Sequence, residues 1–341
     1  MSATFGLDIG TTSIRALSIK KSGNSFAIDS MGIGPVPKNG VASESPGDIK
    51  VFTEAIRTVI ASANIKQKEV NIAIPESQVY TKIIEMPMLS EKELAAALKY
   101  EMEQYIPLPL DQVKTDWQIL SPTVGQEKTS RILLVAASQN LIKKYESVMD
   151  QLGLIPSTIE TEMLSVHRSL FPLVDTQSSN IIVHMGAATT NIAVIENGQI
   201  VMVFTIDRGG IAITRAISLD LGIDIAQAES YKKAYGLNKE AFDGKIGKSL
   251  YPILESILGD IRKTILLYKE KNPSQAITQI ILSGGSAQLP GVDIYFTNQL
   301  NIQVVSGNSF QVYDIKNVPK QVESESLSFN VVAGLALKDV I

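Results

Sequence analysis

The feature of the sequence that most restricts the fold is a pattern that occurs twice, about half a chain apart. Residues 5–28 are FGLDIGTTSIRALSIKKSGNSFAI, and residues 181–204 are IIVHMGAATTNIAVIENGQIVMVF. Each copy has an apolar strand, a glycine with small hydroxylated residues, a second strand, a polar turn and a third strand. Gly and Asn in the turns tolerate the positive φ of tight hairpins. The repetition predicts two lobes that each begin with a hairpin; the alternative is two unrelated hairpins.

Strands and amphipathic helices alternate through the rest of both halves, which is typical of α/β lobes. A capping box of Ser90 and Glu93 predicts the start of one helix. Short apolar runs at 200–206 and 277–282 predict buried strands. The predicted helices cover about 48–63, 90–105, 141–152, 211–221, 224–236, 248–271 and 327–337.

Composition excludes several classes of function. The 341 residues suit two lobes, and 31 Lys+Arg against 35 Asp+Glu give a net charge of −4, unlike a nucleic-acid-binding protein. The absence of cysteine excludes disulfides and thiolate metal sites. No apolar run approaches the roughly 20 residues of a membrane-spanning helix, and the first residues do not resemble a secretory signal. We expect a cytoplasmic protein that reaches a membrane only through a partner.

The first repeated loop carries the residue types of a phosphate site. Asp8 precedes Gly10-Thr11-Thr12-Ser13, and Arg15 follows. Backbone N–H groups and hydroxyls in such a loop can surround a phosphate, and Arg15 can neutralise its oxygens. Asp8 would repel the anion unless Mg²⁺ lay between them, so Asp8 is the candidate for holding the magnesium waters. The alternative is a tight turn with a capping Asp and a surface Arg.

A third stretch, residues 282–291 (LSGGSAQLPG), ends an apolar strand with small residues. Gly284 and Gly285 would let the backbone approach a flat group such as adenine or ribose. A structural turn would explain a lone Gly-Gly equally well.

Together the three stretches resemble the actin, sugar kinase and Hsp70 superfamily, as its phosphate-1, phosphate-2 and adenosine motifs. Within it the chain is most similar to the PilM family of type IV pilus assembly proteins, through KYEMEQYIPLPLDQVKTDWQIL at 99–120, residues 132–162 and AESYKKAYGL at 228–237. The resemblance implies an α/β, two-lobed actin-like (ribonuclease H-like) ATPase fold with an inserted FtsA-type α/β subdomain. It implies these parts: lobe 1 core at 1–79 (subdomain 1A), the insertion at 80–155 (1C-like), the return to lobe 1 and lobe connector at 156–179, lobe 2 at 180–326 (2A, with a smaller 2B at about 222–276) and a C-terminal helix returning to lobe 1 at 327–341.

The resemblance also implies a site for ATP and Mg²⁺ between the lobes. Glu229 and Lys232 match the pair that flanks adenosine, although an exposed helix face is the alternative. Gly209 and Gly210 match the glycines before the nucleotide-side helix. The implied cofactor-binding residues are Asp8, Gly10, Thr11, Thr12, Ser13, Arg15, Gly186, Ala187, Ala188, Thr189, Thr190, Gly209, Gly210, Glu229, Lys232, Gly284, Gly285 and Ser286.

One position departs from the family pattern. The second loop usually carries an Asp before its Gly, and this chain has His184 there. A neutral imidazole cannot replace a carboxylate in holding Mg²⁺ waters; it could hydrogen-bond a phosphate or be purely structural. No carboxylate in that loop offers a base. Glu162, ahead of Glu160, is the candidate for positioning a water, with a hinge or salt-bridge role as the alternative. We expect ATP binding with at most slow hydrolysis.

The resemblance implies that the partner is the cytoplasmic tail of a PilN-like single-span inner-membrane protein, with other pilus assembly or motor components nearby. No nucleic-acid partner is expected, and head-to-tail polymerisation stays open. A catalytic ATPase or small-molecule kinase and a nucleotide-free scaffold are the two competing functions. The candidate peptide-binding residues, for which core packing is the alternative, are Tyr100, Tyr105, Ile106, Pro107 and Leu108.

Overall fold

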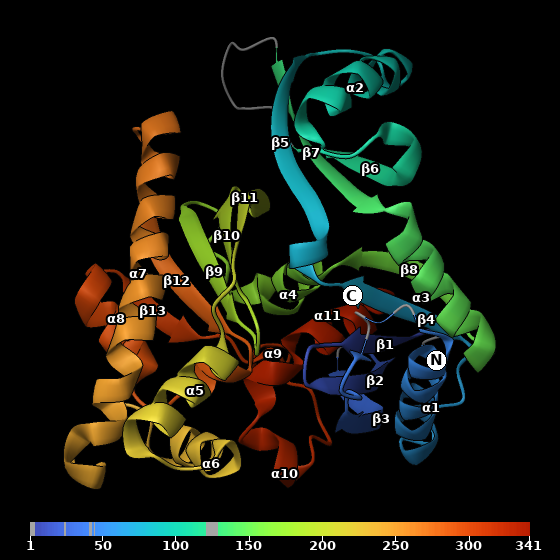
Figure 1. The fold of residues 1–341 in the computed structure, drawn as a ribbon. Helices are drawn as coiled ribbons and strands as arrows, with labels where there is room; N and C mark the ends of the chain where they lie inside the picture. Colours follow the sequence, from blue (N-terminus) through green and yellow to red (C-terminus); the bar gives the residue numbers. More distant parts are fainter. Residues whose placement is uncertain (1–3, 24, 41–42, 44, 121–128) are drawn as a thin grey trace.

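Two five-stranded sheets with the same strand order form the centres of two lobes in the computed structural model (Figure 1). The structure describes residues 4–23, 25–40, 43, 45–120 and 129–341. In each sheet, three successive strands form antiparallel pairs. A fourth strand pairs in parallel with the first of the three, and a fifth pairs in parallel with the fourth. The shared topology confirms the predicted internal repetition.

The sheet of lobe 1 has the order β3-β2-β1-β4-β8. One face is covered by α1 (Pro46–Ser62) and α3 (Gln139–Leu152), whose apolar residues pack on the sheet. The other face meets α11 (Asn330–Leu337), and Gly6 allows it to approach: an added Cβ would lie 2.6 Å from the Val332 carbonyl oxygen. The strands are β1 (Thr4–Ile9), β2 (Ser13–Ser22), β3 (Ser25–Pro35), β4 (Glu69–Ile74) and β8 (Ile155–Thr161).

The sheet of lobe 2 has the order β11-β10-β9-β12-β13. The predicted burial of strand 277–282 is confirmed by β12, but 200–206 forms β11, an edge strand on which Phe204 is exposed. The apolar run did not separate these cases because a short apolar run does not show whether a strand is central or at the edge of its sheet. The strands are β9 (Ser179–Met185), β10 (Thr190–Glu196), β11 (Gln199–Ile206), β12 (Ile277–Ser283) and β13 (Gln303–Ser306).

Helices of lobe 2 begin and end close to where the sequence predicts. Asp224 accepts a hydrogen bond from the Gln227 N–H at 2.9 Å, as a helix cap should, and Gly236 ends the same helix. Figure 1 shows the longest helix, α7, standing along the outer side of the sheet. The helices are α5 (Gly210–Leu221), α6 (Ile225–Tyr235), α7 (Lys245–Lys271) and α8 (Val292–Leu300), followed by the short α9 (Ser309–Val312) and α10 (Lys320–Glu323).

A three-stranded sheet of order β5-β7-β6 projects between the lobes. Its helix α2 (Glu91–Tyr105) begins with the predicted capping box, since Ser90 and Glu93 bond each other reciprocally. The region 80–155 also contains α3, which packs in lobe 1, and the domain division stays a prediction. The strands are β5 (Val79–Pro87), β6 (Val113–Ile119) and β7 (Thr129–Ser138).

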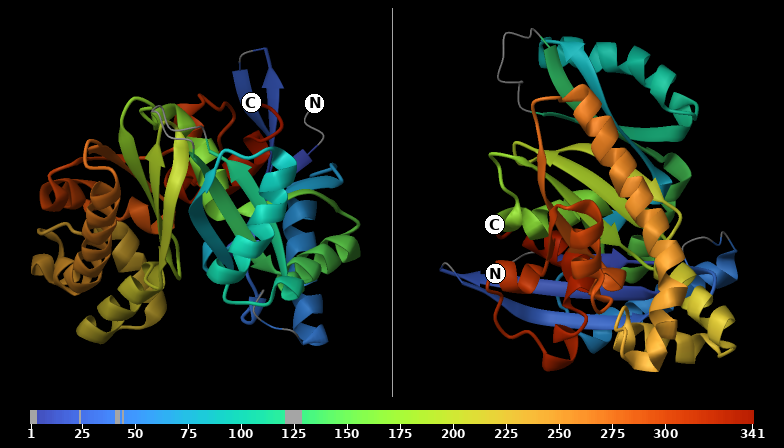
Figure 2. Two further views of the ribbon diagram at one scale, coloured as in Figure 1. Left: turned by 90° about the horizontal axis from the view of Figure 1, so that it is seen from above. Right: turned by 90° about the vertical axis from the view of Figure 1, so that its left-hand side faces the viewer.

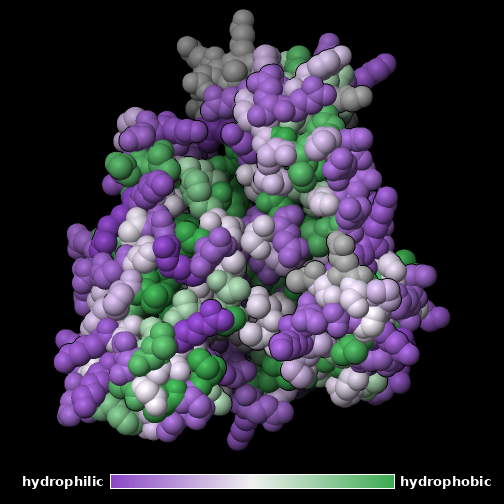
Figure 3. All heavy atoms as spheres, in the orientation of Figure 1, coloured by the Kyte–Doolittle hydropathy of each residue, from purple (hydrophilic) through white to green (hydrophobic). Residues whose placement is uncertain are grey.

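The small sheet also contacts lobe 2. Leu120 and Leu133 belong to the same apolar cluster as the lobe 2 core, and hydrophobic side chains line the recess between the two parts (Figure 3). Arg131 forms an ion pair with Glu196 at 3.0 Å, and Glu196 also accepts a hydrogen bond from the Tyr268 hydroxyl at 2.7 Å. The insertion is therefore joined by the chain to lobe 1 and by side chains to lobe 2. The left view of Figure 2 shows the insertion beside the strands of lobe 2.

A separate apolar cluster lies where the lobes meet. α4 (Glu162–Leu170) and α11 pack together there with residues of β4 and of the lobe 2 sheet. Gly334 of α11 touches α4 so closely that an added Cβ would lie 1.9 Å from the Ser165 carbonyl oxygen. Among the described residues, no helix is long and apolar enough to cross a membrane.

Candidate functional site

The two repeated loops have the same backbone arrangement. In the β1–β2 loop the Gly10 N–H donates to the Ser13 carbonyl at 3.0 Å, and in the β9–β10 loop the Gly186 N–H donates to the Thr189 carbonyl at 2.9 Å. Each loop thus closes between antiparallel strands of one lobe. The paired hairpins follow from the shared sheet topology, in which β1 and β9 occupy equivalent places.

Both loops line one cavity of about 840 Å³ between the lobes. That volume lies within the roughly 300–1,000 Å³ of typical ligand sites. The structure brings most of the predicted site residues together there. Those that line the cavity are Asp8, Gly10, Thr11, Thr12, Ser13, Arg15, Glu162, Gly186, Ala187, Thr189, Gly210, Glu229, Lys232, Gly284, Gly285 and Ser286.

Three predicted residues do not line the cavity. Gly209 instead lies against the second loop, where an added Cβ would be 2.7 Å from the Gly186 carbonyl oxygen. Thr190 is buried and its hydroxyl donates to the Arg208 carbonyl at 2.7 Å. Ala188 is half-buried in the loop. Gly209 and Thr190 therefore support the shape of the loop.

Sequence reasoning did not assign some residues that line the cavity. Ile211 and Thr214 follow Gly210 on α5, so helical spacing from that glycine could have indicated Thr214. Others come from α6 and from segments near residues 288 and 325, where no local signal marks them. His184, for which the sequence left a phosphate hydrogen bond or a structural role open, also lines the cavity. The unassigned lining residues are Ile211, Thr214, Ile225, Ala226, Lys233, Gln288, Leu289, Ser324, Glu325, Ser328 and Val331.

The wall formed by lobe 2 is held by a buried lysine. Lys232 is 7% exposed, so the solvated-face alternative is wrong for it. Its Nζ donates to the Glu229 carboxylate at 2.6 Å, to the Thr214 hydroxyl at 2.9 Å and to the Gly210 carbonyl at 3.2 Å. The lysine thereby fixes α6 to the start of α5. Burial lowers the pKa of Lys232, while Glu229 opposes that shift.

The small residues after β12 join that wall to the second loop. Gly284 has φ +88°, and an added Cβ would lie 2.4 Å from the Met185 carbonyl oxygen. The Ser286 hydroxyl donates to the Gly186 carbonyl at 2.9 Å. The structural-turn interpretation therefore holds for Gly284, while Gly285 is exposed toward the cavity.

Asp8 and Arg15 face each other in the first loop. Their side chains approach to 3.5 Å, and the Arg15 guanidinium also lies over the Phe329 ring at 5.2 Å. Burial raises the pKa of Asp8 to about 6, and Arg15 opposes this shift. Arg15 Nε is buried without a hydrogen-bond partner among the described residues. The surface-Arg alternative is wrong, because this side chain lines the cavity.

Glu162, at the start of α4, lies on the floor of the cavity. Its Oε2 atom accepts weak hydrogen bonds from the Asn191 side chain at 3.3 Å and from the Glu76 N–H at 3.4 Å. Burial raises its pKa to about 8, and the nearby charge of Asp8 adds to the shift. Glu160 does not line the cavity; it pairs with Arg168 at 2.6 Å and with Lys338 at 2.9 Å. The salt-bridge alternative therefore applies to Glu160.

The predicted peptide-binding residues differ in exposure. Tyr100 is 76% exposed on α2, whereas Ile106 is buried in the core of the insertion. Tyr105 is partly covered by Lys82, whose Nζ lies 4.4 Å from the ring centroid. Pro107 is exposed and Leu108 is half-buried. For Ile106 the core-packing alternative holds.

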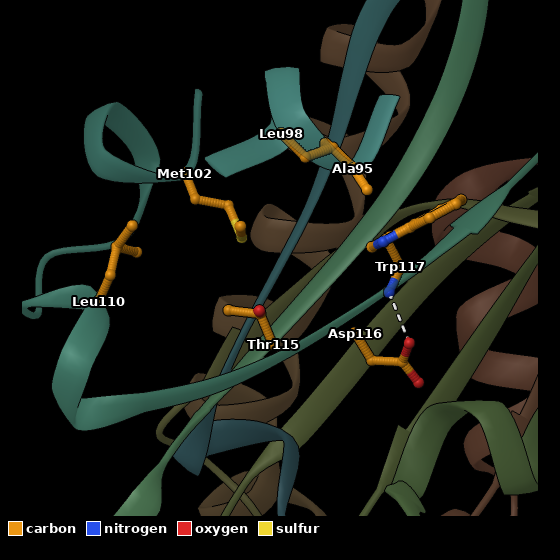
Figure 4. Close-up of a pocket in the computed structure, with 7 residues that line it drawn as sticks. All are labelled: Ala95, Leu98, Met102, Leu110, Thr115, Asp116 and Trp117. Carbon is orange, nitrogen blue, oxygen red and sulfur yellow. Dashed lines mark hydrogen bonds between the residues drawn. The ribbon is translucent and has the colours of Figure 1, made fainter. Parts of the chain in front are cut away.

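A second hollow, of about 360 Å³, lies within the insertion (Figure 4). α2 contributes apolar side chains on one side, and β6 contributes polar and aromatic ones on the other. None of the five predicted peptide-binding residues lines it. Its lining residues are Ala95, Leu98, Met102, Leu110, Thr115, Asp116 and Trp117.

Comparison with known proteins agrees with this architecture. The family model described as type IV pilus assembly protein PilM matches residues 6–340. The cell division protein FtsA of Bacillus subtilis (strain 168) is 22% identical over 355 residues, covering 90% of this chain and 79% of FtsA. FtsA of Neisseria meningitidis serogroup B is 23% identical and covers 88% of this chain and 82% of its own.

Two solved structures share the fold. The PilM-PilN type IV pilus biogenesis complex matches with a TM-score of 0.85 and 22% identity, covering 99% of both chains. MreB 5 of Spiroplasma citri bound to AMPPNP matches with a TM-score of 0.52 and 15% identity, covering 97% of this chain and 94% of its own. The predicted α/β actin-like ATPase fold is confirmed.

Proposed function

The chain belongs to the type IV pilus assembly protein PilM family, and from this premise we propose that it is a nucleotide-dependent adaptor. It binds Mg-ATP between its lobes, and it binds the cytoplasmic tail of a PilN-like inner-membrane protein on the surface of lobe 1 and the insertion. That partner holds it at the cytoplasmic face of the inner membrane, near other pilus assembly or motor components.

The observation that carries the nucleotide part is the pair of equivalent loops facing one cavity. Gly10 and Gly186 close the two loops with the same hydrogen bond, one in each lobe. A polyphosphate held between them would contact both lobes at once, so its binding would favour the closed arrangement. The fold supports the choice of an adenine nucleotide, since the MreB 5 structure holds AMPPNP.

The side chains of the first loop suit an anion with its metal. The Arg15 side chain lines the cavity, and its guanidinium can donate hydrogen bonds to phosphate oxygens. Asp8 is the carboxylate that would hold the waters of Mg²⁺. Its ion pair with Arg15 would then be replaced by two new pairs, Asp8 with Mg²⁺ and Arg15 with the phosphate. A bound Mg²⁺ neutralises phosphate charge.

The same site is poorly built for rapid hydrolysis. A general base must be ionised near neutral pH, and burial raises the pKa of Glu162 to about 8. A carboxyl group with a raised pKa holds its proton more tightly at neutral pH, which makes it a poor base for water. Binding with slow turnover suits an adaptor whose nucleotide sets its shape.

The partner is supported by the match to the PilM-PilN complex and by apolar side chains exposed on the insertion. Met88 is 63% exposed, Tyr100 is 76% exposed, and Tyr80 and Tyr105 are also exposed. Such side chains can bind a short tail segment that inserts its own apolar residues.

The nucleotide part is tested by calorimetric titration of the protein with Mg-ATP, with phosphate release followed on the same samples. We expect wild-type binding with little phosphate released, and affinity reduced about 10- to 100-fold or more by Asp8→Asn. Asp29→Asn, an exposed carboxylate on β3 of the same sheet, is the control and should bind as wild type. No wild-type binding would favour the scaffold, and rapid phosphate release would favour the enzyme.

The partner part is tested separately with a synthetic peptide of the PilN-like tail encoded in the same genome. Fluorescence anisotropy should show binding that Tyr100→Ala weakens about tenfold, which corresponds to roughly 1.4 kcal/mol. Phe242→Ala removes an exposed aromatic from lobe 2 and is the control. Equal affinities for wild type and Tyr100→Ala would place the peptide elsewhere.

A further inference from the structure

His184 lies at the end of a chain of buried hydrogen bonds that starts at Asn330, the first residue of α11. Its Nδ1 atom is 3.0 Å from the Ser283 hydroxyl oxygen, on the neighbouring strand β12. Ser283 is fully buried, and His184 is 8% exposed and lines the cavity between the lobes. Since Nδ1 is engaged behind the site, Nε2 is the ring nitrogen left for the cavity.

The direction of this chain is fixed by Asn330. Its Oδ1 accepts from the Ser309 N–H at 3.1 Å, and its Nδ2 donates to the Gly307 carbonyl at 2.7 Å. An N–H can only donate and a carbonyl can only accept, so the amide cannot be turned over. The Nδ2 group therefore also donates, at 2.8 Å, to the Ser283 oxygen.

The hydroxyl proton of Ser283 then determines the tautomer of His184. Within the described chain, the other hydrogen-bond partner of the Ser283 hydroxyl is Nδ1 of His184. If Nδ1 carried a proton, the Ser283 proton would have no acceptor in a fully buried place, which is costly. The arrangement that satisfies every group has Ser283 donating to Nδ1, so the proton of the neutral ring is on Nε2.

We infer that His184 binds a phosphate of the nucleotide directly, as a neutral Nε2–H donor held in that tautomer by Ser283 and Asn330. This inference rests on the proposed nucleotide function. It assigns the second loop a metal-independent role: the loop offers a hydrogen bond where a carboxylate would need a metal ion between itself and the anion. Mg²⁺ is then needed only on the side of Asp8.

The electrostatic surroundings keep the ring neutral. Burial lowers the pKa of His184 to about 4, and the Arg15 charge across the cavity adds to this shift. The Asn191 side chain, which is opposite His184 on β10, donates to Glu162. Above about pH 5 the ring is a neutral donor, while Arg15 supplies the positive charge.

The tautomer is tested first by NMR on protein with ¹⁵N-labelled histidine. The chain has two histidines, so His167→Gln assigns both signals. We expect the Nε2–H form for His184 without ligand, and a mixture of forms in Ser283→Ala. An Nδ1–H form in the wild type would overturn the inference, whatever the nucleotide does.

Binding is tested by titration with ATP, once with Mg²⁺ and once with EDTA. His184→Ala should lose about 10- to 100-fold in affinity under both conditions, because a hydrogen bond to a charged phosphate is lost. His184→Asp should bind more weakly still in EDTA and recover with Mg²⁺, so that its metal dependence exceeds that of the wild type.

The outcomes distinguish the proposed nucleotide function from the role inferred for His184. Failure of the wild type to bind Mg-ATP would reject the proposed function. Wild-type binding with the same EDTA affinity in His184→Ala would reject this inference and leave the proposed function intact. An equal metal dependence in wild type and His184→Asp would also reject it. A shift of the Nε2 proton signal of His184 on addition of ATP in EDTA would support it directly.

Discussion

The β1–β2 loop and the β9–β10 loop differ in chemistry although they have the same backbone. Both are closed by one N–H···O bond of about the same length, at 3.0 Å and 2.9 Å. The first loop is preceded by Asp8, which faces Arg15, whereas the second is preceded by His184, which is fixed from behind by Ser283. The backbone follows from a repeated topology, whereas the side chains differ. Under the proposed function, the first loop would supply charge and hold the metal ion, and the second would supply a neutral hydrogen-bond donor.

The largest expected effect concerns the support behind the second loop. Gly284→Ala should lower the free energy of unfolding by roughly 3 kcal/mol, because the residue has φ +88° and an added Cβ would meet the Met185 carbonyl at 2.4 Å. Denaturant unfolding measures this. Gly285→Ala is the matched control, since its Cβ would meet Ser328 only at 3.6 Å, and it should change stability by less than about 0.5 kcal/mol. An equal loss of stability in both variants would show that the close contact of Gly284 with Met185 does not support the second loop.

The next effect concerns the carboxyl group between the loops. The folded-state pKa of Glu162 is raised from 4.5 to about 8 by burial. Between these values the folded protein holds a proton that the unfolded chain has released, so stability falls as pH rises from about 5 to 8. Glu162→Gln should remove this part of the fall, on the order of 3 kcal/mol at pH 8.

Urea unfolding at several pH values checks this prediction. Glu325→Gln removes a carboxylate that lines the same cavity but is 43% exposed, so it should leave the pH dependence unchanged. The pKa of Asp8 is also raised, so the Glu162→Gln protein should still lose some stability as the pH rises to about 6. A Glu162→Gln protein with the wild-type pH dependence would mean that Glu162 is already ionised in the folded state.

The smallest effect compares the loops directly. A Cβ at Gly10 would lie 3.3 Å from the Ser13 carbonyl oxygen, and one at Gly186 would lie 3.0 Å from the Thr189 carbonyl oxygen. Gly10→Ala and Gly186→Ala should each lower stability by about 1 kcal/mol or less, with Gly186→Ala the more costly. Thermal unfolding of the two variants side by side measures the difference. A much larger loss of stability in Gly10→Ala would show that the two loops are packed differently although their hydrogen bonds are alike.

Much of the fold was accessible from the sequence because its signals are local. The repeated hairpins, the capping box at Ser90 and the cap at Asp224 all depend on residues a few positions apart. The loop residues from Asp8 to Arg15 also lie in one continuous stretch. Sequence reasoning could therefore assign the site's centre, and the structure brings these residues to one cavity.

The features that were not predictable depend on contacts between distant segments. The tautomer inferred for His184 depends on Ser283, which is 99 positions away in the chain, and on Asn330, which is farther still. The burial of Ile106 depends on how α2 packs on its sheet. The strand β5 was not predicted at all. Lys82 and Glu85, both exposed, interrupt the apolar residues between Val79 and Pro87.

The ion pair of Arg131 with Glu196 makes the insertion the third side of a closed triangle of contacts. Lobe 1 is linked to the insertion by the chain, the insertion to lobe 2 by Arg131 and its apolar neighbours, and lobe 2 to lobe 1 by α4 and α11. The two lobes and the insertion thus contact one another pairwise. A change of angle between the lobes must therefore be matched at Arg131 or along the small sheet, so the cavity and the outer surface of the insertion are mechanically parts of one frame.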